Sequence, residues 1–155
     1  MTRPDPSSSG PPQVLFDTSV LVAGIVAAHP AHALALPWLQ RAHRGSIGFL
    51  VATHTVAELY AVLSTLPVRP RIGPGLARQL VRENVLAKAK VVSLSAADYE
   101  AVIDEVADLG LSGGIVYDAL LARAFRKSGG GKLLTLNPRD FVRAWPAGAP
   151  DVVRP

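Results

Sequence analysis

Short apolar runs alternate with longer helical segments along this chain, and this alternation restricts the fold more than any other feature. Candidate strands cover Val14–Phe16, Ile47–Ala52, Val91–Val92, Lys132–Thr135 and Val152–Val153. Helices are expected at about 20–28, 31–43, 55–66, 76–88, 95–110, 116–127 and from 138 onward. Strands separated by helices form parallel sheets with helices on both faces. The expected fold is therefore a three-layer α/β/α sandwich with a mainly parallel central sheet.

Length and composition predict one soluble domain. The chain has 155 residues, 49% of them hydrophobic, and no cysteine, which excludes disulfides, zinc–thiolate sites and thiol nucleophiles. Residues 1–12 are rich in Pro, Ser and Gly and are expected to form a disordered tail, which leaves residues 13–155 for the domain. The segment lacks the pattern of a secretory signal, and the apolar stretch Val20–Ala28 is too short to span a bilayer. A cytoplasmic location is expected.

The net charge of +4 and the pI of about 9.9 indicate a basic surface. Such a surface favours a polyanionic partner such as a nucleic acid. The alternative is that the Arg-, Ala- and Pro-rich composition reflects only genomic base composition.

Acidic residues lie where predicted helices begin, and most of these helices follow a strand. The four positions are Asp17, Glu58, Asp118 and Asp140. Open α/β sheets form their sites at the carboxyl ends of strands, so carboxylates that are distant in the chain can meet there. A cluster of carboxylate oxygens suits Mg²⁺ or Mn²⁺. The sequence therefore predicts a divalent-metal site.

Each acid also has a structural explanation. Asp17 can cap a helix, and Glu58 can complete a capping box that begins at Thr55. Asn137 and Asp140 can serve as the N-cap and the third residue of the last helix. Two observations favour function: Glu58 belongs to a helix that is apolar on most sides, and Asp118 shares a helix face with Leu121, Ala122 and Phe125. A carboxylate in apolar surroundings needs a partner.

Basic residues at helical spacing follow Asp118 on the same helix. Arg123, Arg126 and Lys127 form a stripe that Arg139 and Arg143 can extend. The stripe is either a line of RNA phosphate contacts or a solvated face at the helix C-terminus.

Two other signals are discounted. Gly129–Lys132 lacks the Ser or Thr and the following helix that a phosphate loop requires. The four histidines show no metal-binding spacing and are interpreted as surface or hydrogen-bonded residues: His29, His32, His43 and His54.

Four segments together resemble the successive motifs of PIN domains, and in particular the VapC-type toxins of bacterial toxin–antitoxin pairs. They are Val14–Val20, Ala57–Tyr60, Tyr117–Ala122 and Leu134–Phe141. The resemblance implies an α/β/α fold that cleaves RNA with Mg²⁺ or Mn²⁺, homodimerises and pairs with a small VapB-like antitoxin. Asp17, Glu58 and Asp118 match the three core acidic positions. The fourth position matches either Asn137 or Asp140.

The resulting hypothesis is an endoribonuclease in which a metal-activated water hydrolyses the phosphodiester bond. Asp17, Glu58, Asp118 and Asp140 are the expected catalytic and metal-binding residues. Hydrogen bonds from neighbouring polar residues are expected to orient them: Thr18, Ser19, Thr135 and Asn137. The alternative is a non-catalytic RNA-binding or regulatory module on the same scaffold. A phosphoacceptor of the receiver type is disfavoured because Lys132 precedes its strand.

Overall fold

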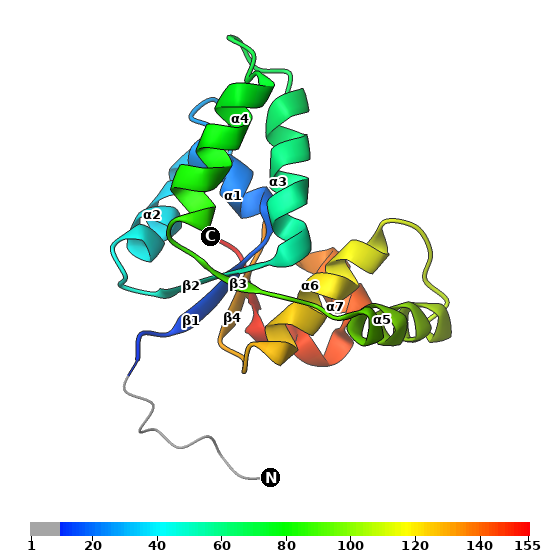
Figure 1. Cartoon of the computed structure of the whole chain (residues 1–155). Helices are drawn as coiled ribbons and strands as arrows, with labels where there is room; N and C mark the ends of the chain where they lie inside the picture. The colour runs from blue at the N-terminus through cyan, green and yellow to red at the C-terminus, as the bar shows by residue number, and fades with distance from the viewer. Residues whose placement is uncertain (1–9) are drawn as a thin grey trace.

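The computed structural model describes residues 10–155, within which the chain forms one parallel sheet with helices on both sides (Figure 1). The strand order is β3-β2-β1-β4-β5, and every neighbouring pair is parallel. The strands are β1 (Gln13–Phe16), β2 (Gly48–Ala52), β3 (Lys90–Val92), β4 (Lys132–Leu134) and β5 (Val152–Val153). All five predicted strands are present, and their ends differ only slightly from the predicted ones.

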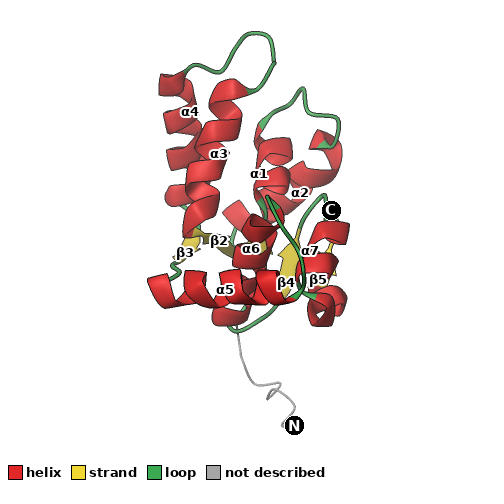
Figure 2. Ribbon diagram, turned by 90° about the vertical axis from the view of Figure 1, so that its right-hand side faces the viewer, coloured by secondary structure: helices red, strands yellow, loops and turns green. Residues whose placement is uncertain are grey.

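The helices form two layers (Figures 1 and 2). One layer contains α1 (Thr18–Ile25), α2 (His32–His43), α3 (Thr53–Thr65) and α4 (Pro74–Val81), which continues into a π-helical turn at Arg82–Leu86. The other contains α5 (Ala96–Asp108), α6 (Ile115–Lys127) and α7 (Pro138–Ala144), followed by a 3₁₀ segment at Pro146–Asp151. The predicted three-layer sandwich is confirmed.

Side chains of the central strands alternate between the two layers, as the pleat requires. Phe16 and Val51 pack in the cluster formed with α1 to α4, while Leu15, Leu50 and Leu133 pack in the cluster that contains residues of α6 and α7. Because both faces are covered, the strands are apolar throughout rather than alternating with polar residues.

From the carboxyl ends of β1 and β4 the chain turns toward opposite faces of the sheet. These strands are neighbours, yet β1 leads into α1 in one layer and β4 leads into α7 in the other. Such a divergence opens a crevice above the strand ends. The backbone N–H of Asp17 donates a 2.9 Å hydrogen bond to the Leu134 carbonyl, which fixes the base of this crevice.

The apolar character of α3 predicts a helix that is buried on most sides, and this expectation is wrong. The helix begins at Thr53, slightly earlier than predicted, and its buried residues are Thr55, Leu59 and Leu63. Tyr60 is 40% exposed, and Ala57 and Ala61 are also exposed. In the described part of the chain no other element packs closely on this part of α3, so these apolar residues remain accessible to solvent.

The predicted disordered tail falls mainly on residues 1–9, which lie outside the described residues. Among residues 10–155, none of the helices combines the length and apolar character that crossing a membrane requires.

Candidate active site

Three of the predicted acids line one hollow at the carboxyl ends of β1 and β4. Asp17 directly follows β1, Glu58 lies in α3, and Asp118 lies in the first turn of α6. The hollow has a volume of about 500 Å³, and Asn137 also lines it. Carboxylates that are distant in the chain therefore meet in space, as their positions near the starts of helices predicted.

Hydrogen bonds from two hydroxyl groups hold the Asp17 carboxylate. Ser19 Oγ donates to Asp17 Oδ2 at 2.6 Å, and Thr135 Oγ1 donates to the same oxygen at 2.8 Å. The hydroxyls are themselves fixed: Ser19 Oγ accepts from the Leu136 N–H at 3.1 Å, and Thr135 Oγ1 accepts from the Asn137 N–H at 3.0 Å. The loop after β4 therefore orients the acid that follows β1.

Glu58 points across the site rather than back along its own helix. Thr18 Oγ1 donates a 3.1 Å hydrogen bond to Glu58 Oε2. Because α3 begins at Thr53 and its N-cap position makes no side-chain capping bond, the capping-box explanation of Glu58 is wrong. Burial raises the pKa of Glu58, a change that the Thr18 hydrogen bond opposes and the charge of Asp17 reinforces.

Burial and neighbouring negative charges act together on the Asp118 carboxyl. Burial, followed by the charges of Asp17, Asp140 and Glu58, raises the pKa of Asp118 to about 7. Within residues 10–155, no ion pair reaches Asp17, Glu58 or Asp118. The site therefore holds hard oxygen donors whose negative charge is not compensated.

A divalent cation fits this donor set, because it supplies the missing positive charge and prefers carboxylate oxygens. The acids and histidines of residues 10–155 do not form a tight cage ready to hold an ion.

The two candidates for the fourth position differ in their surroundings. Asn137 lines the hollow, and although it occupies the N-cap position of α7, its side chain makes no capping hydrogen bond. Asp140 lies in the first turn of α7, where its carboxylate forms an ion pair with Arg143 at 3.8 Å. The negative charge of Asp140 contributes to the raised pKa of Asp118.

Most of the predicted basic stripe has acidic partners on α5. Asp98 pairs with Arg123 at 3.1 Å and with Lys127 at 2.7 Å, and Glu105 pairs with Arg126 at 3.0 Å. The Lys127 hydrogen bond, aided by the Ser95 backbone, holds the pKa of the Asp98 carboxyl well below its usual range.

Asp98 also completes a capping box with Ser95 at the N-terminus of α5. Nothing in the sequence pattern indicated that α5 packs along α6, so these ion pairs were not predicted. Arg139 makes no ion pair among the described residues.

His54 was not predicted to belong to the site. His32 Nδ1 and His43 Nε2 hydrogen-bond to backbone carbonyls, as expected of satisfied histidines. His54, in contrast, is half-buried, and its Nδ1 has no hydrogen-bond partner in residues 10–155. Burial lowers the pKa of His54, against the charge of Asp17 and the backbone of Tyr117. Its helical spacing from Glu58, which places both on the same helix face, was the available signal.

A parallel α/β/α sandwich with carboxylates gathered beyond β1 and β4 is the architecture of a PIN domain. The PIN domain family matches residues 14–144, and the chain belongs to this family. The family resemblance inferred from the four sequence motifs is confirmed.

Individual relatives agree with this assignment. Ribonuclease VapC40 of Mycobacterium tuberculosis is 34% identical over 123 residues, which cover 79% of this chain and 85% of that protein. The crystal structure of M. tuberculosis VapC20, described as a Sarcin-Ricin loop cleaving toxin, has a TM-score of 0.62 at 16% identity and covers 77% of this chain and 86% of that one. VapBC2 from Rickettsia felis, bound to a promoter DNA fragment, has a TM-score of 0.59 at 18% identity, covering 92% and 97%.

Proposed function

We propose that this protein is a metal-dependent endoribonuclease that acts as the toxin of a toxin–antitoxin pair. Ribonuclease activity is the named property of the relative VapC40, which matches most of this chain. The observation that carries the proposal is the carboxylate site: Asp17, Glu58 and Asp118 line one hollow without an ion pair, and the pKa of Asp118 is raised to about 7.

The proposed ligands of Mg²⁺ are Asp17, Glu58 and Asp118, with Asp140 and Asn137 nearby, and Mn²⁺ is expected to substitute. When bound, the cation lowers the pKa of a water molecule and neutralises charge on the phosphate. The chain itself orients the ligands. Ser19 and Thr135 hold Asp17, and Thr18 holds Glu58, so these carboxylates lose little freedom when a cation binds.

The substrate is proposed to reach the site beside α7. Arg139, free of ion pairs in the described chain, is the proposed phosphate contact. Arg123, Arg126 and Lys127 remain candidate RNA contacts, but their ion pairs with α5 acids favour a role in packing.

A VapB-like antitoxin is the proposed partner, because the structural relative VapBC2 is a complex. A homodimer and a cytoplasmic location complete the proposal.

The test is cleavage of purified RNA by wild-type protein and by Asp118→Asn in Mg²⁺ or Mn²⁺. Asp118→Asn removes a charged ligand while keeping the shape of the side chain, so metal-dependent cleavage is expected to fall by about a hundredfold or more. Asp104→Asn is the matched control, since Asp104 is an exposed acid on α5. Undiminished cleavage by Asp118→Asn contradicts the proposal. RNA binding without cleavage by the wild type favours the non-catalytic alternative.

A further inference from the structure

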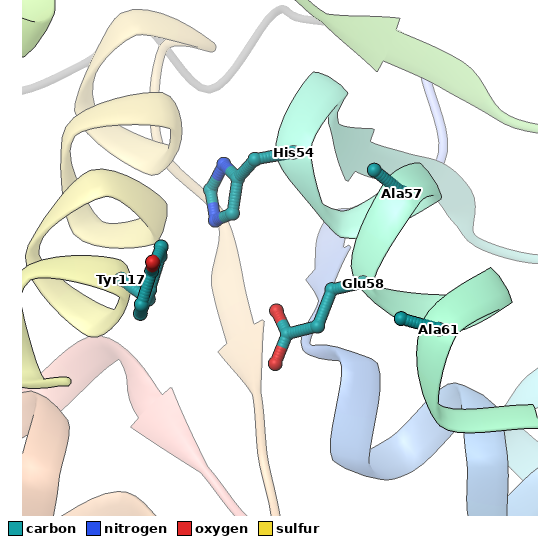
Figure 3. Close-up of a pocket in the computed structure, with 5 residues that line it drawn as sticks. All are labelled: His54, Ala57, Glu58, Ala61 and Tyr117. Carbon is teal, nitrogen blue, oxygen red and sulfur yellow. The ribbon is translucent and has the colours of Figure 1, made fainter. Parts of the chain in front are cut away.

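A second hollow adjoins the carboxylate site and has a different character. It has a volume of about 400 Å³ and is lined by His54, Ala57, Glu58, Ala61 and Tyr117 (Figure 3). Glu58 lines both hollows, so the two adjoin at this side chain. Apart from Glu58 and His54, the lining is apolar. We call this space the α3–α6 pocket.

The walls of the α3–α6 pocket leave room for a flat group. Tyr117 projects from α6 on one side, while the methyl groups of Ala57 and Ala61 face it from α3 (Figure 3). Alanines at these positions leave the wall of α3 without a long side chain. His54 lies at one end of the pocket, where its Nδ1 has no hydrogen-bond partner among the described residues.

Tyr117 is unusual for its place in the fold. It is 59% exposed, although the neighbouring residues Ala119 and Leu120 on α6 are buried. An exposed aromatic ring beside a site for nucleic acid provides a surface on which a base can stack. The pocket therefore combines a stacking surface, an apolar wall and a position beside the carboxylates.

We propose that the α3–α6 pocket binds a nucleobase of the RNA, on the nucleotide next to the phosphate that is cleaved, by stacking on Tyr117. The inference rests on the proposed ribonuclease function and adds a base-binding subsite to it. Because Glu58 belongs to both hollows, a nucleotide with its phosphate at the carboxylates has its base within reach of Tyr117. Single-stranded RNA meets this geometry, since its bases are free to leave the stack.

A second copy of the chain is the competing occupant. A stable protein interface buries on the order of 1,000 Å² or more, much of it around bulky anchor residues. The α3–α6 pocket is a small recess with alanines along one wall, and it shares Glu58 with the carboxylate hollow. These features favour a single planar group over a protein surface.

The experiment uses an oligoribonucleotide with one mapped cleavage site, made intact and with an abasic ribose on either side of the cut. The proteins are wild type, Tyr117→Leu, Tyr117→Phe and, as a control at an exposed tyrosine on α5, Tyr99→Leu. For wild type, kcat/KM is expected to fall about tenfold when one particular base is missing, as the loss of a stacked base predicts. The kcat/KM of Tyr117→Leu on intact RNA is expected to be about tenfold lower than that of wild type. On the RNA that lacks this base, Tyr117→Leu and wild type are expected to have the same kcat/KM. Tyr99→Leu should retain wild-type behaviour, and Tyr117→Phe, which keeps the aromatic ring, should keep the dependence of kcat/KM on that base.

A second variant fills the pocket without touching Tyr117. Ala61→Phe places a ring in the space proposed for the base and should reproduce the Tyr117→Leu result with folding retained, because Ala61 is exposed. The proposal is overturned if Tyr117→Leu lowers kcat/KM relative to wild type by the same factor on intact and on abasic RNA. It is also overturned if the variants change the sedimentation coefficient while wild type cleaves abasic RNA normally.

The two proposals fail separately. If wild type cleaves no RNA, the ribonuclease function is wrong, and base binding is then measured by fluorescence anisotropy with the same oligonucleotides. If neither the missing base nor Tyr117→Leu changes the RNA affinity, the proposed base-binding role of the pocket is wrong as well.

Discussion

Thr135 Oγ1 donates a 2.8 Å hydrogen bond to Asp17 Oδ2, although the two residues are 118 positions apart in the chain. Thr135 is fully buried directly after β4, and Asp17 directly follows β1. The same hydroxyl accepts the Asn137 N–H, so one side chain connects the proposed metal ligand to the loop that carries Asn137. The parallel pairing of β1 with β4 makes this connection possible.

Replacing Thr135 with Val should weaken metal binding with little change in fold. Val keeps the branched shape but cannot donate to Asp17, so the carboxylate loses one of its two orienting hydroxyls. Loss of such an orienting contact typically lowers metal affinity about 10–100-fold. The free energy of unfolding should fall by about 1–2 kcal/mol, because the Asn137 N–H also loses its acceptor. Calorimetric titration with Mn²⁺ and urea unfolding measure the two effects.

Thr65→Val is the matched control. Its hydroxyl bonds to the Ala61 and Val62 carbonyls on an exposed part of α3, away from the carboxylates. Mn²⁺ affinity should be unchanged in this variant. Equal Mn²⁺ affinity in Thr135→Val and wild type would show that Thr135 does not orient a metal ligand.

The stability of the metal-free protein should decrease as pH rises toward 7. The pKa of Asp118 is about 7 in the folded protein and near 3.8 when unfolded, so the folded state binds this proton more tightly. The stability that this proton provides is fully present below about pH 4 and is lost as pH rises through about 7. Because the carboxyl is partly exposed, we expect a loss of only ~1–2 kcal/mol.

Thermal unfolding of wild type and Asp118→Asn from about pH 5 to about pH 8 measures this effect. The amide that replaces the Asp118 carboxyl carries no titrating proton, so the variant should be the more stable protein at the alkaline end of this range without metal. Mn²⁺ should stabilise wild type there more than the variant, since a ligand that binds only the folded state raises stability. Parallel pH profiles for the two proteins would contradict the raised pKa of Asp118.

The strand–helix alternation was sufficient to predict the layers, because short apolar runs between helices can be buried only as strands. The strand ends then placed Asp17 and Glu58 at one edge of the sheet, whereas Asp118, on a helix that follows another helix, was identified by the apolar face that it shares. The interpretation of α3 failed for a different reason. Hydrophobic periodicity shows which residues can be buried, but not whether another element covers them, and nothing in residues 10–155 covers Ala57 and Ala61.

The basic stripe and His54 show the same limit at the level of side chains. Arg123 and Lys127 were interpreted as free cations because their partner Asp98 lies 25 and 29 residues earlier, on a helix whose packing the sequence does not specify. His54 was interpreted as a surface or hydrogen-bonded residue, because the sequence does not show that Tyr117 of another helix lies beside it. Interactions between elements required the structure, whereas the position of each acid near the start of a helix did not.

Asp98→Asn should loosen α5 from α6 and make the protein less resistant to thermal unfolding. Asp98 caps α5 and receives both Arg123 and Lys127. The pKa of Asp98 is held below its usual value, so its contribution is present above about pH 4 and is lost as pH falls below that value. Melting temperatures of wild type and Asp98→Asn should therefore differ at about pH 7 and converge as the pH falls to about 3 and below. Glu100→Gln, at an exposed position on the same helix, is the control and should melt like wild type at both pH values.

Arg139 should contribute to RNA binding more than the arginines of α6. Arg139 lacks an ion pair in the described chain and lies next to Asp140 at the start of α7, whereas Arg123 is held by Asp98. In an Asp118→Asn background, which prevents cleavage, Arg139→Gln should weaken binding to single-stranded RNA. The slope of log K against log[salt] should decrease by about 0.7, the value for one lost phosphate contact. Arg123→Gln should leave that slope unchanged while lowering the melting temperature. If Arg123→Gln reduces the slope and Arg139→Gln does not, the RNA follows α6 and the ion pairs with α5 open when it binds.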